Sequence, residues 1–71
     1  MLTQLKRQIA VKIRSYAAQV SLTQKDIAEL TSTTQPRVSD LFNLKTDKFS
    51  LDMLFKMLQN LDLNVTLTIG D

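Results

Sequence analysis

Residues 24–43 read QKDIAELTSTTQPRVSDLFN, and this stretch holds the most specific residue pattern in the chain. Two short segments of helical periodicity flank the polar turn TSTT, whose hydroxyl side chains compete with helix by bonding to their own backbone. Ala28 is small enough to let two helices cross closely, and the apolar Val38 and Leu41 follow it by ten and thirteen residues. The stretch therefore predicts two short helices that meet at a close crossing.

The same spacing is typical of a helix-turn-helix, in which the second helix projects into the major groove of DNA. Periodicity alone fits an ordinary helical hairpin equally well, but the side chains left outside favour DNA. Gln35 matches the hydrogen-bonding edge of adenine, and Arg37 matches that of guanine. Residues suited to phosphate oxygens are Thr33, Thr34 and Ser39, together with the helix N-terminus. The turn carries no acidic residue, which would repel phosphate, so the pattern favours a DNA-reading edge.

Capping residues predict where the helices begin. Thr23, followed three residues later by Asp26, forms an approximate capping box, Thr34 precedes a helix with Pro36 in its first turn, and Ser50 caps a last helix. The expected helices cover approximately residues 3–19, 24–30, 35–42 and 51–61. The sequence therefore predicts an all-α domain of four to five helices within residues 1–71.

Apolar stripes predict the core. The first stripe comprises Leu5, Ile9, Ile13, Tyr16, Ala17 and Val20, and the last comprises Leu51, Leu54, Phe55, Leu58 and Leu61. The second helix should bury Ile27 and Ala28, with Leu30 as an optional third residue. Asn43 is the expected terminator of the third helix, and residues 44–48 are expected to form a polar loop.

After Asp62 the hydrophobic period changes from helical to alternating, which predicts one half-buried strand over about 63–69. A lone strand leaves its backbone polar groups unpaired, and antiparallel pairing with the same strand of a second copy would satisfy them. A frayed tail is the alternative. The expected dimer interface comprises Met53, Met57, Leu63, Val65, Leu67 and Ile69.

Composition excludes much chemistry. The 71 residues include no His and no Cys, and the one glycine is Gly70, so thiolate catalysis, Ser-His relays, the commonest zinc sites and glycine-rich phosphate loops are unavailable. We expect a non-enzymatic protein without metal or cofactor. With no signal peptide and no long apolar run, a cytoplasmic protein that does not contact membranes is expected.

Charge is distributed unevenly along the chain. Residues 1–45 hold seven basic and three acidic side chains, a balance of +4, while residues 46–71 hold two and four, a balance of −2. An ordinary solvated helix surface would also explain basic residues. A basic front half nevertheless suits a protein that turns one side to a polyanion.

The stretch over residues 24–43 resembles the helix-turn-helix of phage-repressor-type regulators, the Xre and lambda repressor/Cro superfamily. The segments LTQKDIAEL, TTQPRVSDL and KFSLDML together resemble compact HigA-like antitoxins. On this resemblance Gln24 contacts phosphate and buttresses Gln35, while Asn43 and Lys45 grip the DNA backbone. Asp40 reaches the groove edge or orients Arg37.

Four residues depart from the pattern of that superfamily. Ser32 and Leu44 stand where glycine is usual or common, and Thr31 and Thr33 stand where many relatives have apolar residues. In a left-handed backbone a residue other than glycine at position 32 costs roughly 1 kcal/mol. These departures bear on the shape of the turn and remove no expected DNA contact.

The function expected from residues and resemblance together is a sequence-specific transcriptional repressor. It would bind double-stranded DNA as a homodimer on an inverted-repeat operator and control its own operon. One alternative, which rests on the resemblance alone, is an antitoxin that neutralises a co-encoded small toxin of the RelE/HigB-like kind. The other is a phage-derived repressor without a toxin.

Overall fold

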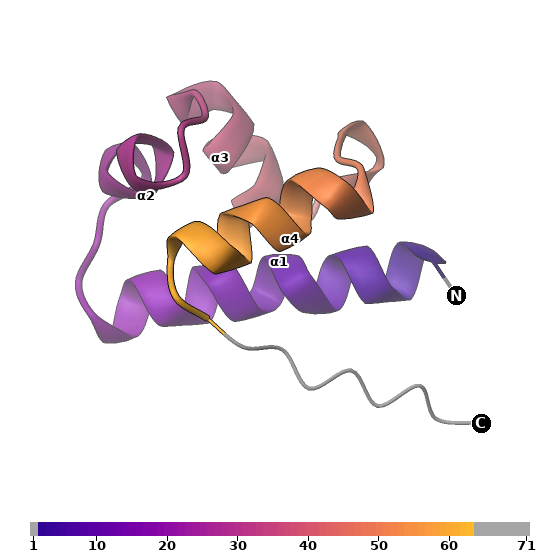
Figure 1. Cartoon of the computed structure of the whole chain (residues 1–71), viewed down its shortest axis with the longest axis horizontal. Helices are drawn as coiled ribbons and strands as arrows, with labels where there is room; N and C mark the ends of the chain where they lie inside the picture. The colour runs from indigo at the N-terminus through magenta and orange to yellow at the C-terminus, as the bar shows by residue number, and fades with distance from the viewer. Residues whose placement is uncertain (1, 64–71) are drawn as a thin grey trace.

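The computed structural model describes residues 2–63, and within that range all of the regular secondary structure is helical. The elements are α1 (Leu2–Gln19), α2 (Gln24–Leu30), α3 (Gln35–Phe42), the short 3-10 helix η1 (Thr46–Lys48) and α4 (Leu51–Asn60). Figure 1 shows the long α1 with α4 beside it and the α2–α3 pair packed above them. The predicted helices are confirmed, whereas the predicted strand lies outside the described residues except for Leu63.

The core is shared by all four α-helices. Its buried hydrophobic residues are Ile9, Ala10, Ile13, Ala17, Ile27, Ala28, Val38, Leu41, Phe49, Leu54, Met57, Leu58 and Leu61. Leu30 is not among them, because it is 49% exposed. A helix turns about 100° per residue, so a residue three places after Ile27 and two after Ala28 points away from the direction those two share. The optional core role of Leu30 is therefore wrong.

All three predicted caps are present. Thr23 and Asp26 form a reciprocal capping box, in which the Asp26 N–H donates to Thr23 Oγ1 over 3.1 Å and the Thr23 N–H donates to Asp26 Oδ2 over 2.9 Å. Thr34 Oγ1 accepts from the backbone of α3, and Ser50 Oγ accepts from that of α4. These caps fix where α2, α3 and α4 begin, and hence the length of the turns between them.

Every α-helix ends in the same glycine-free motif. The residues in left-handed conformation are Ser21, Ser32, Leu44 and Asp62, with φ of 58°, 56°, 62° and 57°. In each case the N–H of the residue that follows donates to the carbonyl five residues earlier, as in Thr33 N to Ala28 O at 2.9 Å and Lys45 N to Asp40 O at 2.9 Å. This is the hydrogen-bond pattern of the Schellman motif.

The end of α3 agrees with the expectation in one respect and differs in another. Asn43 terminates the helix as its C-cap, with φ of −91°, and Leu44 supplies the left-handed residue that follows. Residues 44–48 are not simply a loop, because η1 occupies Thr46–Lys48. Its flanking residue Phe49 is 1% exposed, so the core anchors this connection.

The left-handed Ser32 gives a first test. Ser32→Gly is expected to raise the free energy of unfolding by about 1 kcal/mol, because glycine has no Cβ to clash in this conformation. Urea unfolding measures the change. Ser32→Ala retains the Cβ and serves as the control, and a glycine variant no more stable than the alanine variant would contradict the assignment.

The capping box gives a second test. Two hydrogen bonds from Thr23, chiefly the one from its backbone and secondly the one from its side chain, hold the pKa of the Asp26 carboxyl below its ordinary value. A group with a lowered folded pKa stabilises the protein fully above its unfolded pKa, about 3.9 for Asp, and loses that contribution as the pH falls through the folded pKa. Urea unfolding across this range should show the advantage of wild type over Asp26→Asn disappearing in acid. An advantage that grows on acidification would overturn the prediction.

Candidate nucleic-acid interface

The α2–α3 pair presents one edge of α3 outward. Val38 and Leu41 are both fully buried at 0% exposed and hold α3 against the core. Gln35 and Arg37 lie on the opposite side and are exposed, as expected for side chains that reach a ligand. The orientation of α3 thus leaves both predicted base-reading side chains accessible.

The turn before α3 holds two threonines together through their hydroxyl groups. Thr31 is 5% exposed, and its O–H donates to the carbonyl of Ile27 over 2.6 Å. Its oxygen also lies 2.9 Å from Thr33 Oγ1. These two hydrogen bonds satisfy the buried hydroxyl of Thr31. They explain how threonines can occupy two positions where the resemblance leads one to expect apolar residues.

The hydroxyl hydrogens of this threonine pair determine what Thr33 can donate to a ligand. A threonine hydroxyl has a single hydrogen to donate. Because Thr31 donates its hydrogen to Ile27, the hydrogen between the two threonines comes from Thr33. The Thr33 backbone N–H is engaged with Ala28 as well. Both donors of Thr33 are therefore used within the fold, and in this arrangement neither is left for a phosphate.

Thr34 retains the donor that Thr33 lacks. Its oxygen accepts from the Arg37 N–H over 3.4 Å, which leaves the hydroxyl hydrogen for another acceptor. Pro36 has no N–H, so the first turn of α3 offers fewer backbone donors to an anion than an ordinary helix. The Thr34 hydroxyl and the Gln35 N–H are therefore the donors that lie at the N-terminal end of α3.

An open concavity in the surface brings residues of α2 and α3 together. It is lined by Gln24, Gln35, Pro36 and Ser39. Gln24 begins α2 and Gln35 begins α3, so the two amides share this hollow although eleven residues separate them. This is the proximity that the resemblance implied for Gln24 as the neighbour of Gln35.

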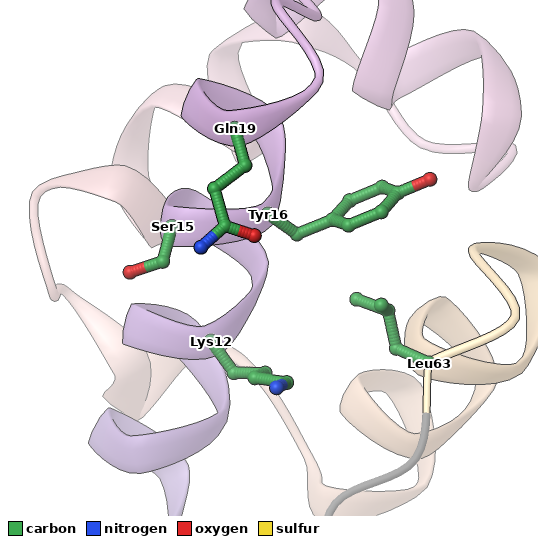
Figure 2. Close-up of a pocket in the computed structure, with 5 residues that line it drawn as sticks. All are labelled: Lys12, Ser15, Tyr16, Gln19 and Leu63. Atoms are coloured by element: carbon green, nitrogen blue, oxygen red, sulfur yellow. The ribbon is translucent and has the colours of Figure 1, made fainter.

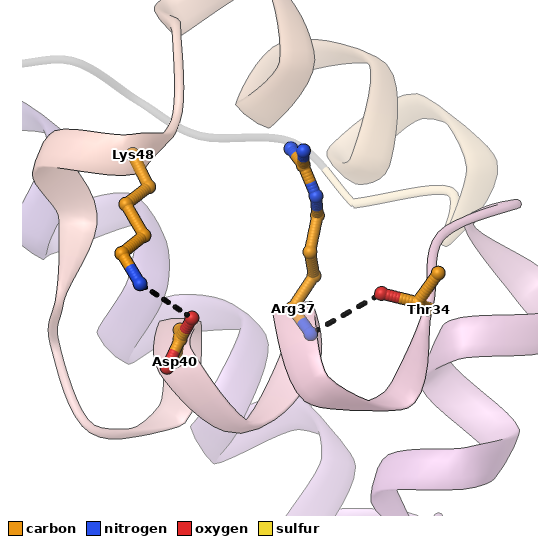
Figure 3. A network of polar contacts seen from close by, with 4 residues as sticks. All are labelled: Thr34, Arg37, Asp40 and Lys48. Atoms are coloured by element: carbon orange, nitrogen blue, oxygen red, sulfur yellow. Dashed lines mark hydrogen bonds and ion pairs between the residues drawn. The ribbon is translucent and has the colours of Figure 1, made fainter.

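Asp40 does not orient Arg37. Figure 3 shows the Asp40 carboxylate paired with Lys48 of η1, with Oδ2 3.4 Å from Nζ. Arg37 instead extends towards α4, where its Nη1 lies 3.8 Å from the sulfur of Met53. That half of the Asp40 expectation is therefore wrong. The ion pair places a cation beside the carboxylate, which reduces the repulsion that Asp40 would exert on a nearby phosphate.

The end of α3 is tied to α1 by a residue that the sequence did not single out. Arg14 Nη1 donates to the carbonyl of Phe42 over 2.8 Å, which places a cation at the negative end of the α3 dipole. Asn43 and Lys45 follow and are exposed. Arg14 and Lys48 were missed because the pairing of each depends on a partner from another element, 28 and 8 residues away.

The expected dimer residues fall into three groups. Met57 is 2% exposed in the chain's own core, so it offers almost no surface to a partner, and we correct its expected role. Met53 is half-buried beneath Arg37. Leu63 lies at the rim of a second hollow, where Figure 2 shows Tyr16 of α1 extending alongside it, with Lys12, Ser15 and Gln19 lining the rest. The remaining members, Val65, Leu67 and Ile69, lie outside the described residues.

Comparison with known proteins bears on this geometry. Residues 2–70, nearly the whole chain, match the model of a protein family described as a helix-turn-helix domain. No curated protein matches the chain. Between residues 2 and 63, none of the helices has both the length and the hydrophobicity that crossing a bilayer requires.

Proposed function

Because this chain belongs to the helix-turn-helix domain family, we propose that it is a sequence-specific transcriptional repressor whose α3 enters the major groove of DNA. The observation that carries the proposal is the division of α3 into two sides. Val38 and Leu41 are 0% exposed, while Gln35 and Arg37 face outward with side chains that match adenine and guanine.

Charge around this edge supports the proposal. Residues 30–39 include no acidic residue. The first acidic residue after them is Asp40, which is paired with Lys48. Lys45 follows α3 and is exposed. In this proposal the phosphate and sugar oxygens at the groove edge are contacted by Thr34, Gln24 and Ser39. The DNA backbone further along is contacted by Asn43 and Lys45. Arg37 reads a base.

The proposed operator is an inverted repeat, because the proposed active form is a homodimer. Two copies related by a twofold axis would present two α3 helices, which fit half-sites about 34 Å apart. The alternating pattern over residues 63–69 supports pairing between the two C-terminal segments. Control of its own operon is part of the same proposal. The antitoxin and phage-repressor alternatives would use the same DNA-binding edge, so the proposal does not require a choice between them.

Selection from a randomised duplex library tests DNA recognition directly. Wild type is expected to enrich one inverted-repeat sequence. On that duplex, Arg37→Ala should cost about 1–3 kcal/mol of binding free energy and relax the preference at one base pair. Lys45→Ala should weaken binding to all duplexes alike and reduce the salt dependence by about one phosphate contact.

Thr33→Val is the control for these variants, because both donors of Thr33 are occupied within the fold. Its affinity for the selected duplex should match wild type. The proposal would be wrong if Arg37→Ala bound the selected duplex as wild type does, or if no sequence were enriched.

The dimer has its own test. Leu67→Glu places a charge on the apolar side of the expected strand and should convert the dimer to a monomer, with loss of binding to the full inverted repeat. Sedimentation equilibrium measures the mass. Thr68→Glu adds the same charge on the alternate side and should remain dimeric. A monomeric wild type, or a dimeric Leu67→Glu variant, would refute strand pairing.

A further inference from the structure

Arg37 rests on a side chain of a different helix. Its Nη1 lies 3.8 Å from Met53 Sδ, although the two residues are sixteen positions apart and belong to α3 and α4. Arg37 is exposed and Met53 is half-buried, so the methionine forms part of the surface on which the arginine lies. In Figure 3 the arginine rises from α3 in this extended conformation.

Met53 is itself held firmly in place. It lies in the first turn of α4, where its backbone N–H bonds to the Ser50 cap over 3.1 Å. Its side chain packs against the buried core of the protein. The backbone that carries this sulfur is therefore held in place, whereas the Arg37 side chain is long and has many rotamers to lose when it binds a base.

The contact leaves enough donors for DNA. A guanidinium has five N–H groups, and a bidentate contact to guanine uses two of them. One N–H on the methionine sulfur leaves four, so Arg37 can touch Met53 and a guanine at the same time. A thioether is a weak and uncharged acceptor, so it neither outcompetes the guanine oxygen nor repels phosphate, as a carboxylate would.

Within residues 2–63, no salt bridge joins Arg37 to an acidic side chain. Asp40, on the same helix as Arg37, is occupied by Lys48 at 3.4 Å. From these contacts we propose that Met53 is a positioning residue that restricts Arg37 to the conformation that reads its base pair, and so sharpens the specificity of that position. This inference rests on the proposed function and adds a residue of α4 to the determinants of sequence preference.

The test uses Met53→Leu, which keeps apolar volume and removes the sulfur acceptor. The probe is the duplex enriched by wild type, together with duplexes altered at the base pair where Arg37→Ala loses preference. Discrimination at that base pair should fall roughly two- to fivefold, the range for losing one weak hydrogen bond. Discrimination at the other base pairs, and the mass of the dimer, should not change.

Two controls separate positioning from packing. Met57→Leu makes the same substitution one turn later, in the core, and should leave base preference unchanged. In the Arg37→Ala background, Met53→Leu should cause no further loss of discrimination, because the arginine that it positions is absent.

The outcomes are distinct. Failure of wild type to enrich any duplex would refute the proposed function. Successful enrichment with wild-type discrimination by Met53→Leu would overturn the role of Met53 alone. An equal loss with Met57→Leu, or an additional loss in the Arg37→Ala background, would assign the effect to α4 packing and would also overturn it.

Discussion

The burial of Val38 and Leu41 is the constraint on which the rest of this structure depends. The helix that carries them, α3, spans only Gln35–Phe42, a length that is marginal for an isolated helix in water. Its orientation is therefore set by these two side chains, both 0% exposed in the shared core. Because they face inward, the side chains of Gln35 and Arg37 on the other side of α3 face outward. The same packing thus stabilises the short helix and aims the edge that would read DNA.

The hydrogen bonds made within the fold then decide which polar groups remain available to a ligand. Thr31 and Thr33 form hydrogen bonds with each other and with the Ile27 carbonyl of α2, which satisfies the polar groups that stand in place of the apolar residues expected from the resemblance. The consequence is that Thr33 has no donor to offer, whereas the Thr34 hydroxyl does. The proposed interface is therefore smaller than the full set of polar residues around the turn, and it consists of α3, the residues beside its two ends and Gln24 of α2.

Contacts between elements refine this edge further. The ion pair with Lys48 gives Asp40 a local partner, Arg14 binds the last carbonyl of α3, and Met53 supports Arg37. Each of these contacts joins α3 to a different element, namely η1, α1 and α4. The short helix α3 is thus held at its middle by the core and around its surface by three neighbouring elements, which limits how far its side chains can reorient.

The sequence by itself determined the helices, because hydrophobic periodicity and the caps Thr23, Thr34 and Ser50 are local signals that act within one turn. It also identified the two sides of α3. Only the tertiary structure decided the partners of Asp40 and Arg37, the exposure of Leu30 and the burial of Met57, because these depend on how separate helices are placed against one another. The left-handed ends show the same division. The sequence identified Ser32 as a residue standing where glycine is usual. Only the folded backbone showed that all four α-helices are followed by a left-handed residue other than glycine.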